Sequence, residues 1–174
     1  KKLFFVTHPW YFKGKFHDQS HNLPRWQIIW LKETFLKFKK KFKINKNIYI
    51  DRTESKFSHC QIINHLELKK YLRKKKFKIV KLASQSFAKQ IYMFWNANCI
   101  IGAHGAALTN LVFCKAKTKV IELKPFGHPG KNYQRISKVN NLHYYSIESQ
   151  KKYLKNKNGD IFVDLKKLDK KINL

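Results

Sequence analysis

Hydrophobic positions along this chain follow a strand-like pattern in some segments and a helix-like pattern in others. Short apolar runs typical of buried strands occur at 3–6, 47–51, 77–82, 98–103, 119–123 and 143–147. The segments between them carry apolar residues at helical spacing, at 24–38, 59–75, 87–97, 106–113 and 132–141. Pro24 suits a first helical turn, and Ser84 or Ser86 can cap the helix that follows them. Strands that alternate with helices in this way predict an α/β fold with a doubly wound, mainly parallel sheet covered on both faces.

The length of 174 residues suits a single hydrophobic core. We expect residues 1–24 to form a first strand and a loop, residues 25–150 to form the α/β domain, and residues 151–174 to form a tail with a short strand and a helix. No apolar run is long enough to cross a bilayer, and the run near the start is too short for a signal peptide. Since the first residue is Lys1, we expect the sequence to be a piece of a longer protein.

A formal net charge of +28 first suggests a partner with many negative charges, such as nucleic acid or an anionic membrane. Only Arg25, Arg52, Arg73 and Arg135 are arginines, however, and arginine is preferred where bases or phosphates are held by two hydrogen bonds. We therefore interpret most of the lysines as a solvated surface. Nucleic acid is not the partner we expect, and a basic polyanion-binding module without catalytic activity stays the alternative function.

Three candidate functional residues follow predicted strands. Arg52 comes after the strand at 47–51, His104 after the strand at 98–103, and Glu122 near the end of the strand at 119–123. Open α/β sheets bind ligands beyond the carboxyl ends of their strands. These residues should therefore meet at one edge of the sheet. Each of them can also have a purely structural role. A histidine can have its hydrogen bonds satisfied within a core, an arginine can form an ion pair with an acidic residue on the surface, and a glutamate can cap a helix.

The segment NCIIGAHGAALTN, at 98–110, combines a buried strand with a small-residue turn. Gly105 allows a tight turn from strand to helix, and Ala106 and Ala107 leave the approach open. The free N–H groups of the first helical turn are suited to bind a phosphate. His104, and Thr109 or Asn110, can each add a hydrogen bond to it. The glycine content alone is weak evidence for a phosphate-binding loop, because this segment is neither a GxGxxG sequence nor a Walker loop.

These segments together resemble glycosyltransferase family 61. The similarity rests on IYIDR, QIINHLEL, a helix with QI, the HGAALTN loop and KVIEL, and it covers roughly residues 25–150. It implies that the chain is the carboxyl-terminal, donor-binding half of a GT-B glycosyltransferase. The missing amino-terminal domain of the same protein would bind the acceptor and supply the general base, so the catalytic residues are unknown.

The resemblance implies an inverting transferase that uses a nucleotide-sugar, usually a UDP-sugar, to extend a polysaccharide or glycan such as a capsule. It implies no other cofactor. No Asp-x-Asp sequence occurs in the chain, and Cys60, Cys99 and Cys114 have no metal-ligand spacing, so we predict no metal. The resemblance assigns roles at the donor to seven residues: Arg52 at the diphosphate, His104, Gly105 and Ala106 in the phosphate loop, Thr109 and Asn110 at the helix beneath it, and Glu122 at the ribose hydroxyls.

The chain departs from the family pattern in two places. Cys60, Asn64 and His65 stand where a basic residue and INE are usual, and Ala107 replaces a second glycine. Another nucleotide-using Rossmann enzyme, such as a methyltransferase, is a weaker alternative, because no glycine-rich turn follows the first strand. The composition, rich in lysine and poor in cysteine, favours a bacterial cytoplasmic protein, with the ER or Golgi lumen as the alternative for a eukaryotic one.

Overall fold

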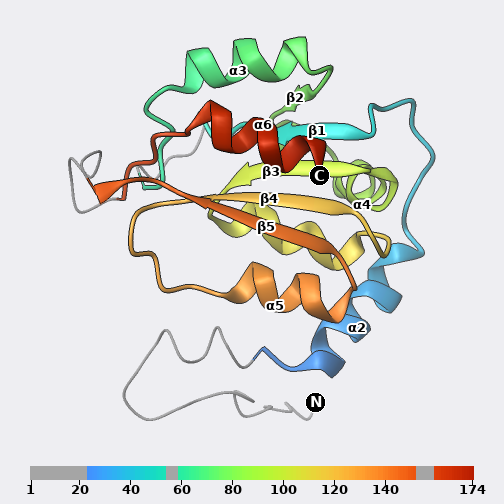
Figure 1. The fold of residues 1–174 in the computed structure, drawn as a ribbon. Helices are drawn as coiled ribbons and strands as arrows, with labels where there is room; N and C mark the ends of the chain where they lie inside the picture. Colours follow the sequence, from blue (N-terminus) through green and yellow to red (C-terminus); the bar gives the residue numbers. More distant parts are fainter. Residues whose placement is uncertain (1–22, 54–58, 152–158) are drawn as a thin grey trace.

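A five-stranded sheet organises residues 23–53, 59–151 and 159–174, the part of the chain that the computed structural model describes (Figure 1). Its strands are β1 (Asn47–Ile50), β2 (Lys78–Val80), β3 (Cys99–Ala103), β4 (Lys119–Lys124) and β5 (His143–Glu148). All neighbouring strands pair in parallel, in the order β2-β1-β3-β4-β5. The predicted parallel, Rossmann-like α/β fold is confirmed. The strand and loop expected within 1–22 lie outside the described residues.

The helices that connect and cover these strands agree with the sequence pattern, with two differences. They are α2 (Arg25–Leu36), α3 (His65–Lys74), α4 (Phe87–Asn96), α5 (Asn132–Val139) and α6 (Leu165–Asn173), together with the short 3-10 helices η1 (Leu82–Ser84) and η2 (Ala106–Phe113). Helix α3 begins later than expected, because Ile62 pairs with Ile161 in a parallel bridge. The segment 106–113 has the expected bounds but coils as a 3-10 helix. Of the two candidate caps, Ser86 is used, since its hydroxyl accepts from the backbone N–H of Lys89.

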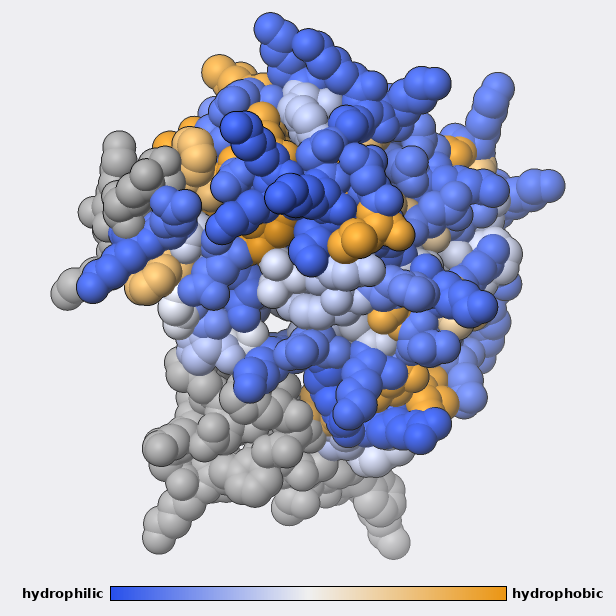
Figure 2. Space-filling model, in the orientation of Figure 1, coloured by the Kyte–Doolittle hydropathy of each residue, from blue (hydrophilic) through white to orange (hydrophobic). Residues whose placement is uncertain are grey.

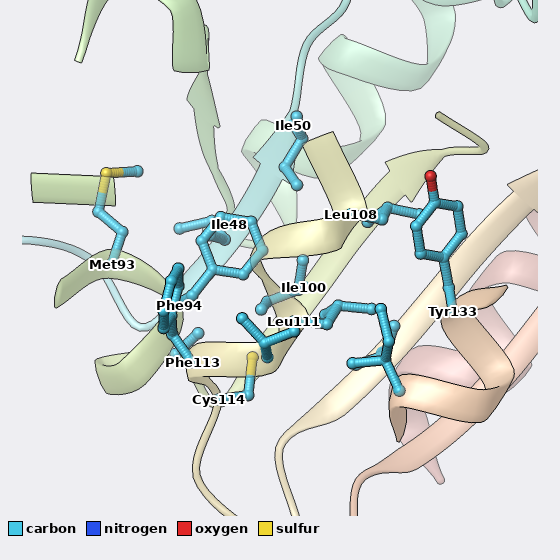
Figure 3. Close-up of a cluster of buried hydrophobic side chains, with 14 of the residues drawn as sticks. Ile48, Ile50, Met93, Phe94, Ile100, Leu108, Leu111, Phe113, Cys114 and Tyr133 are labelled. Atoms are coloured by element: carbon cyan, nitrogen blue, oxygen red, sulfur yellow. The ribbon is translucent and has the colours of Figure 1, made fainter. Parts of the chain in front are cut away.

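Apolar side chains form one cluster on each face of the sheet, because successive strand residues point to opposite sides. Ile100 belongs to the cluster beneath α2, α4, η2 and α5, where Figure 3 shows it beside Leu111 and Ile48. Its neighbour Ile101 belongs to the cluster beneath α3 and α6. The central strand β3 is buried along its whole length, as expected for a parallel sheet covered on both faces.

The carboxyl-terminal tail is part of this core. Ile161, Val163 and Leu168 are almost fully buried in the cluster beneath α3 and α6. The Asn64 side chain ties the tail to the start of α3, since its amide donates to the carbonyl of Val163 and its oxygen accepts from the Val163 N–H, both at 3.0 Å. The tail therefore completes the second face of the sheet.

The order of the strands creates a switch point between β1 and β3. From β1 the chain crosses by α3 to β2 on one side, whereas from β3 it proceeds to β4 and β5 on the other. The loops after β1 and β3 therefore diverge, and doubly wound folds bind their ligands in the crevice that results. In Figure 1 the strand arrows point to the left, so this crevice lies at the left edge of the sheet. Among the described residues no helix is both long and apolar enough to span a membrane.

Candidate functional site

The sheet brings the three residues predicted at its carboxyl edge into one connected group. Ile50, Gly102 and Glu122 lie side by side in the register of β1, β3 and β4, so Arg52 and His104 emerge at the same level just beyond them. An Nη1 hydrogen of Arg52 is donated to the backbone carbonyl of His104. The His104 Nδ1 atom lies 2.5 Å from Glu122 Oε1.

Glu122 is a buried acceptor that fixes the orientation of the His104 ring. Its side chain is 1% exposed, and its second carboxylate oxygen accepts a hydrogen bond from the Tyr144 hydroxyl. Burial raises the pKa of Tyr144, and the nearby negative charge of Glu122 raises it further, so this hydroxyl keeps its proton. Because a carboxylate only accepts, Nδ1 of His104 is the donor in this pair. The Nε2 atom is therefore the ring nitrogen with which His104 can bind a ligand.

Gly105 is required by the close approach of Arg52. Its φ of +152° is one that side-chain-bearing residues rarely adopt, and a Cβ built there would lie 2.2 Å from Arg52 Nη1. From the sequence, Gly105 was expected to allow a tight turn from strand to helix. The structure adds that the missing side chain makes room for the guanidinium group, which lies against the turn.

The start of η2 presents small side chains and backbone to solvent. Ala106 and Thr109 are exposed, whereas Leu108 is fully buried, as the threefold repeat of a 3-10 helix allows. The Asn110 side chain is directed into the protein, since its amide donates to the Ala107 carbonyl and to Gln90 Oε1, each at 3.3 Å. Asn110 therefore supports the loop from beneath, while Ala106 and Thr109 lie on its open side.

Two aromatic rings that the sequence interpretation did not single out complete the group. The His128 ring centroid lies 3.8 Å from that of His104, and the Tyr133 centroid lies 5.1 Å from it. Burial, followed by the charge of Glu122, raises the pKa of Tyr133 to about 12. Their position along the sequence could have identified them as candidates. His128 lies in the loop after β4 and Tyr133 in the first turn of α5, so both lie at the carboxyl edge of the sheet. Together they cover one side of the His104 ring.

Arg52 lies between two hollows at the switch point. The larger has a volume of about 290 Å³ and is lined by residues of β1, of the segment before α3 and of the first turn of α3, including Tyr49, Cys60 and His65. The smaller, of about 140 Å³, lies toward Leu82 and Ala107. Burial raises the pKa of the Cys60 thiol, which its neighbour Arg52 partly offsets. The described residues contain no group of three or more His, Cys, Asp or Glu side chains that could hold a metal ion.

Asp51 supports the Arg52 loop through a nearly buried ion pair. Its carboxylate lies 2.7 Å from Lys69 Nζ, with the two side chains 3% and 15% exposed, and it also accepts from the Thr53 N–H. Burial by itself raises the pKa of Asp51, but the hydrogen bonds from Lys69 and Thr53 outweigh it and leave the pKa below its ordinary value. The pair holds the backbone in place at the end of β1 and so fixes the position from which the Arg52 side chain extends.

We expect this pair to make part of the stability depend on pH. Because the pKa of Asp51 is lowered, the pair stabilises the fold above the ordinary aspartate pKa of about 4, and this contribution is lost as the pH falls through the lowered value. Asp51→Asn should therefore reduce the loss of stability on acidification, measured by urea unfolding at neutral and acidic pH. Glu33→Gln is the control, since it removes an exposed carboxylate that takes part in no salt bridge found among the described residues. An equal effect of both variants would contradict the prediction.

The chain resembles a known protein family over more than half of its length. The sequence profile of glycosyltransferase 61 matches residues 4–121, which is more than half of the chain and includes Arg52 and the whole segment 98–110. The matched segment begins before residue 25, where the resemblance seen in the sequence begins, and it ends just before Glu122. No curated protein matches the chain. A glycosyltransferase is an enzyme that transfers a sugar from a donor to an acceptor, and the chain belongs to glycosyltransferase family 61.

Proposed function

We propose that this chain is the donor-binding half of an inverting, metal-independent glycosyltransferase that uses a nucleotide-sugar with UDP as its nucleotide. The observation that carries the proposal is the connected group of Arg52, His104 and Glu122 at the switch point of the sheet. It places a guanidinium group and an oriented imidazole beside a small-residue turn, which is a combination suited to a diphosphate.

Sugar transfer requires positive charge and hydrogen-bond donors at the leaving group. As the glycosidic bond breaks, negative charge builds on the departing diphosphate, and fixed donors stabilise it most where that charge develops. Arg52 has further guanidinium hydrogens beyond the one given to the His104 carbonyl. When both of its ring nitrogens carry protons, His104 donates from Nδ1 to Glu122 and from Nε2 to a phosphate oxygen. These donors require no metal.

The remaining donor-site residues take supporting roles in this proposal. Ala106 and Thr109 are exposed on the open side of the loop, where phosphate oxygens can reach them, whereas Gly105 is buried against Arg52 and shapes the turn of the phosphate loop. Asn110 holds the loop from beneath through the Ala107 carbonyl. Glu122 positions His104, and a ribose hydroxyl would have to replace the Tyr144 hydroxyl to reach its second oxygen.

The acceptor and the general base belong to the rest of the protein under this proposal. Inversion needs a base that deprotonates the acceptor hydroxyl on the face opposite the leaving group, and we assign it to an amino-terminal domain across the cleft. The acceptor would be a polysaccharide or glycan. We place the reaction in the cytoplasm, which the three buried free thiols Cys60, Cys99 and Cys114 support, since a reducing compartment keeps such thiols free.

Calorimetric titration with UDP in the absence of metal tests the proposal. We expect binding, and we expect Arg52→Ala to weaken it about 10- to 100-fold, because a hydrogen bond to a charged group contributes roughly 1.5–3 kcal/mol. Arg73→Ala is the matched control, since this arginine is exposed near the end of α3 and should leave binding unchanged.

Salt separates this function from the alternative. UDP binding in a small, partly enclosed site should change little between low and high salt, whereas a polyanion-binding module should bind nucleic acid with an affinity that falls steeply as salt rises. Absence of UDP binding together with salt-sensitive binding of a polyanion would overturn the proposed function.

A further inference from the structure

Helix α2 carries large aromatic side chains on the side that faces away from the core. Ile28 points inward and is fully buried, whereas Trp26 and Trp30 are 59% and 53% exposed. These two tryptophans are four residues apart, so they lie on the same side of the helix. A surface helix of a globular protein normally has polar residues on its outer side. The outer side of α2 is therefore suited to contact something other than water alone.

The exposed aromatic surface continues beyond the two tryptophans. The Phe35 ring centroid lies 6.3 Å from that of Trp30, 6.4 Å from that of Phe38 and 5.6 Å from that of Phe87. Phe38 and Phe87 are themselves about half exposed. Phe35 thus joins residues of α2, α4 and the intervening segment into one aromatic patch, which is larger than isolated exposed side chains explain.

A dense group of lysines adjoins this patch. The segment 37–46 contains six lysines, all of them exposed: Lys37, Lys39, Lys40, Lys41, Lys43 and Lys46. None of them takes part in a salt bridge found among the described residues. The segment is anchored where the Phe42 ring packs against Tyr92, with centroids 6.0 Å apart. The only acidic residue between 25 and 46 is Glu33, so the local charge is strongly positive.

We propose that this surface, formed by Trp26, Trp30, Phe38 and the six lysines, docks the protein on an anionic lipid bilayer. Tryptophan and phenylalanine rings insert at the boundary between headgroups and acyl chains, and lysines are attracted to the negative surface of the membrane. A membrane presents diffuse charge, which lysine meets as well as arginine does, whereas nucleic-acid recognition favours arginine. The segment 37–46 has six lysines and no arginine, which favours the membrane.

The position of the surface leaves the proposed donor site open to the aqueous phase. The segment 37–46 leads into the amino end of β1 and lies at the right edge of Figure 1, whereas the carboxyl ends of the strands point to the left. Figure 2, in the same orientation, shows mostly hydrophilic side chains across the face between these two edges. A soluble nucleotide-sugar could thus reach Arg52 while the protein is bound to the membrane. The docking surface is independent of the residues assigned to the donor.

Co-sedimentation with vesicles tests the inference. We expect binding to mixed phosphatidylcholine and phosphatidylglycerol vesicles and little binding to pure phosphatidylcholine. The triple variant Lys39→Gln, Lys40→Gln, Lys41→Gln should weaken binding on the order of 100-fold, because each lysine near an anionic surface contributes roughly 1 kcal/mol. The control variant Lys166→Gln, Lys167→Gln, Lys170→Gln removes the same charge from exposed positions on α6, on the opposite face of the sheet, and should bind as the unmodified protein does.

A second measurement distinguishes insertion from simple charge attraction. We expect brominated lipids to quench tryptophan fluorescence in the unmodified chain, and we expect Trp26→Ser with Trp30→Ser to remove most of the quenching while UDP binding persists. Equal losses in the two lysine variants, or vesicle binding without quenching, would overturn the inference. Tighter binding to single-stranded RNA that the α2 variants abolish would also overturn it and identify the surface as one for nucleic acid.

Discussion

Gly105→Ala is expected to disrupt the proposed donor site more than an alanine at any other glycine that the structure describes. The new Cβ would lie 2.2 Å from Arg52 Nη1, so the guanidinium group must leave its place against the turn. It would then lose its hydrogen bond to the His104 carbonyl, and the residue itself would be strained at a φ of +152°. Together these effects should cost about 3–5 kcal/mol. We expect a large fall in the free energy of unfolding and no measurable UDP binding.

Gly127→Ala is the matched control for this prediction. Gly127 also has a positive φ, of +67°, but a Cβ there would meet nothing within 4 Å. Its replacement should therefore cost only the backbone strain, about 1–2 kcal/mol, and leave UDP affinity unchanged. Chemical unfolding and calorimetry on both variants separate the steric effect from the conformational one. If the two variants behave alike, the contact with Arg52 has no role in binding or stability.

Glu122→Gln is expected to have the second largest effect. The carboxylate accepts from both His104 Nδ1 and the Tyr144 hydroxyl in a nearly dry site. A glutamine offers one oxygen and one N–H₂ group, so one of the two donors would face another donor. The loss of a buried, charge-assisted interaction should lower the free energy of unfolding by about 2–3 kcal/mol. UDP binding should weaken as well, because the His104 ring loses the acceptor that orients it.

Two further variants make the result for Glu122 interpretable. Glu148→Gln changes an exposed carboxylate on β5 that accepts from the Gly127 N–H at 2.5 Å, and it should change stability by less than about 1 kcal/mol. Tyr144→Phe leaves His104 and Glu122 paired, so it should lower stability but keep most of the UDP affinity. If Tyr144→Phe weakens UDP binding as much as Glu122→Gln does, then Glu122 does not act through His104 alone.

The placement of Arg52, His104 and Glu122 at one edge could be predicted because it depends only on strand direction. Parallel strands end at the same edge, and each of these residues stands at or just beyond the end of an apolar run. What the pattern could not supply is which atoms meet. Arg52 binds the backbone of His104, and Glu122 has both oxygens occupied within the protein, which depends on the register of three strands.

The rings around His104 could not be predicted for a different reason. His128 and Tyr133 stand in a loop and in the first turn of a helix, and Tyr144 lies in the edge strand β5, so no local pattern distinguishes them from ordinary aromatic residues. His128 and Tyr133 meet His104, and Tyr144 meets Glu122, only because the strand order places β5 next to β4 and returns α5 over the same face. Contacts of this kind join residues distant in sequence and become visible only after the chain has folded.

By itself, the sequence determined the class of fold, the parallel direction of the strands and the edge at which function is expected, because hydrophobic periodicity reports which residues must be buried together. It also determined where most helices begin and end. Only the tertiary structure decided that residues 106–113 form a 3-10 helix, that Gly105 makes room for Arg52 and that the tail completes the core. The physical reason is that packing, steric exclusion and hydrogen bonding between distant segments depend on distances in space, and periodicity along a chain does not contain them.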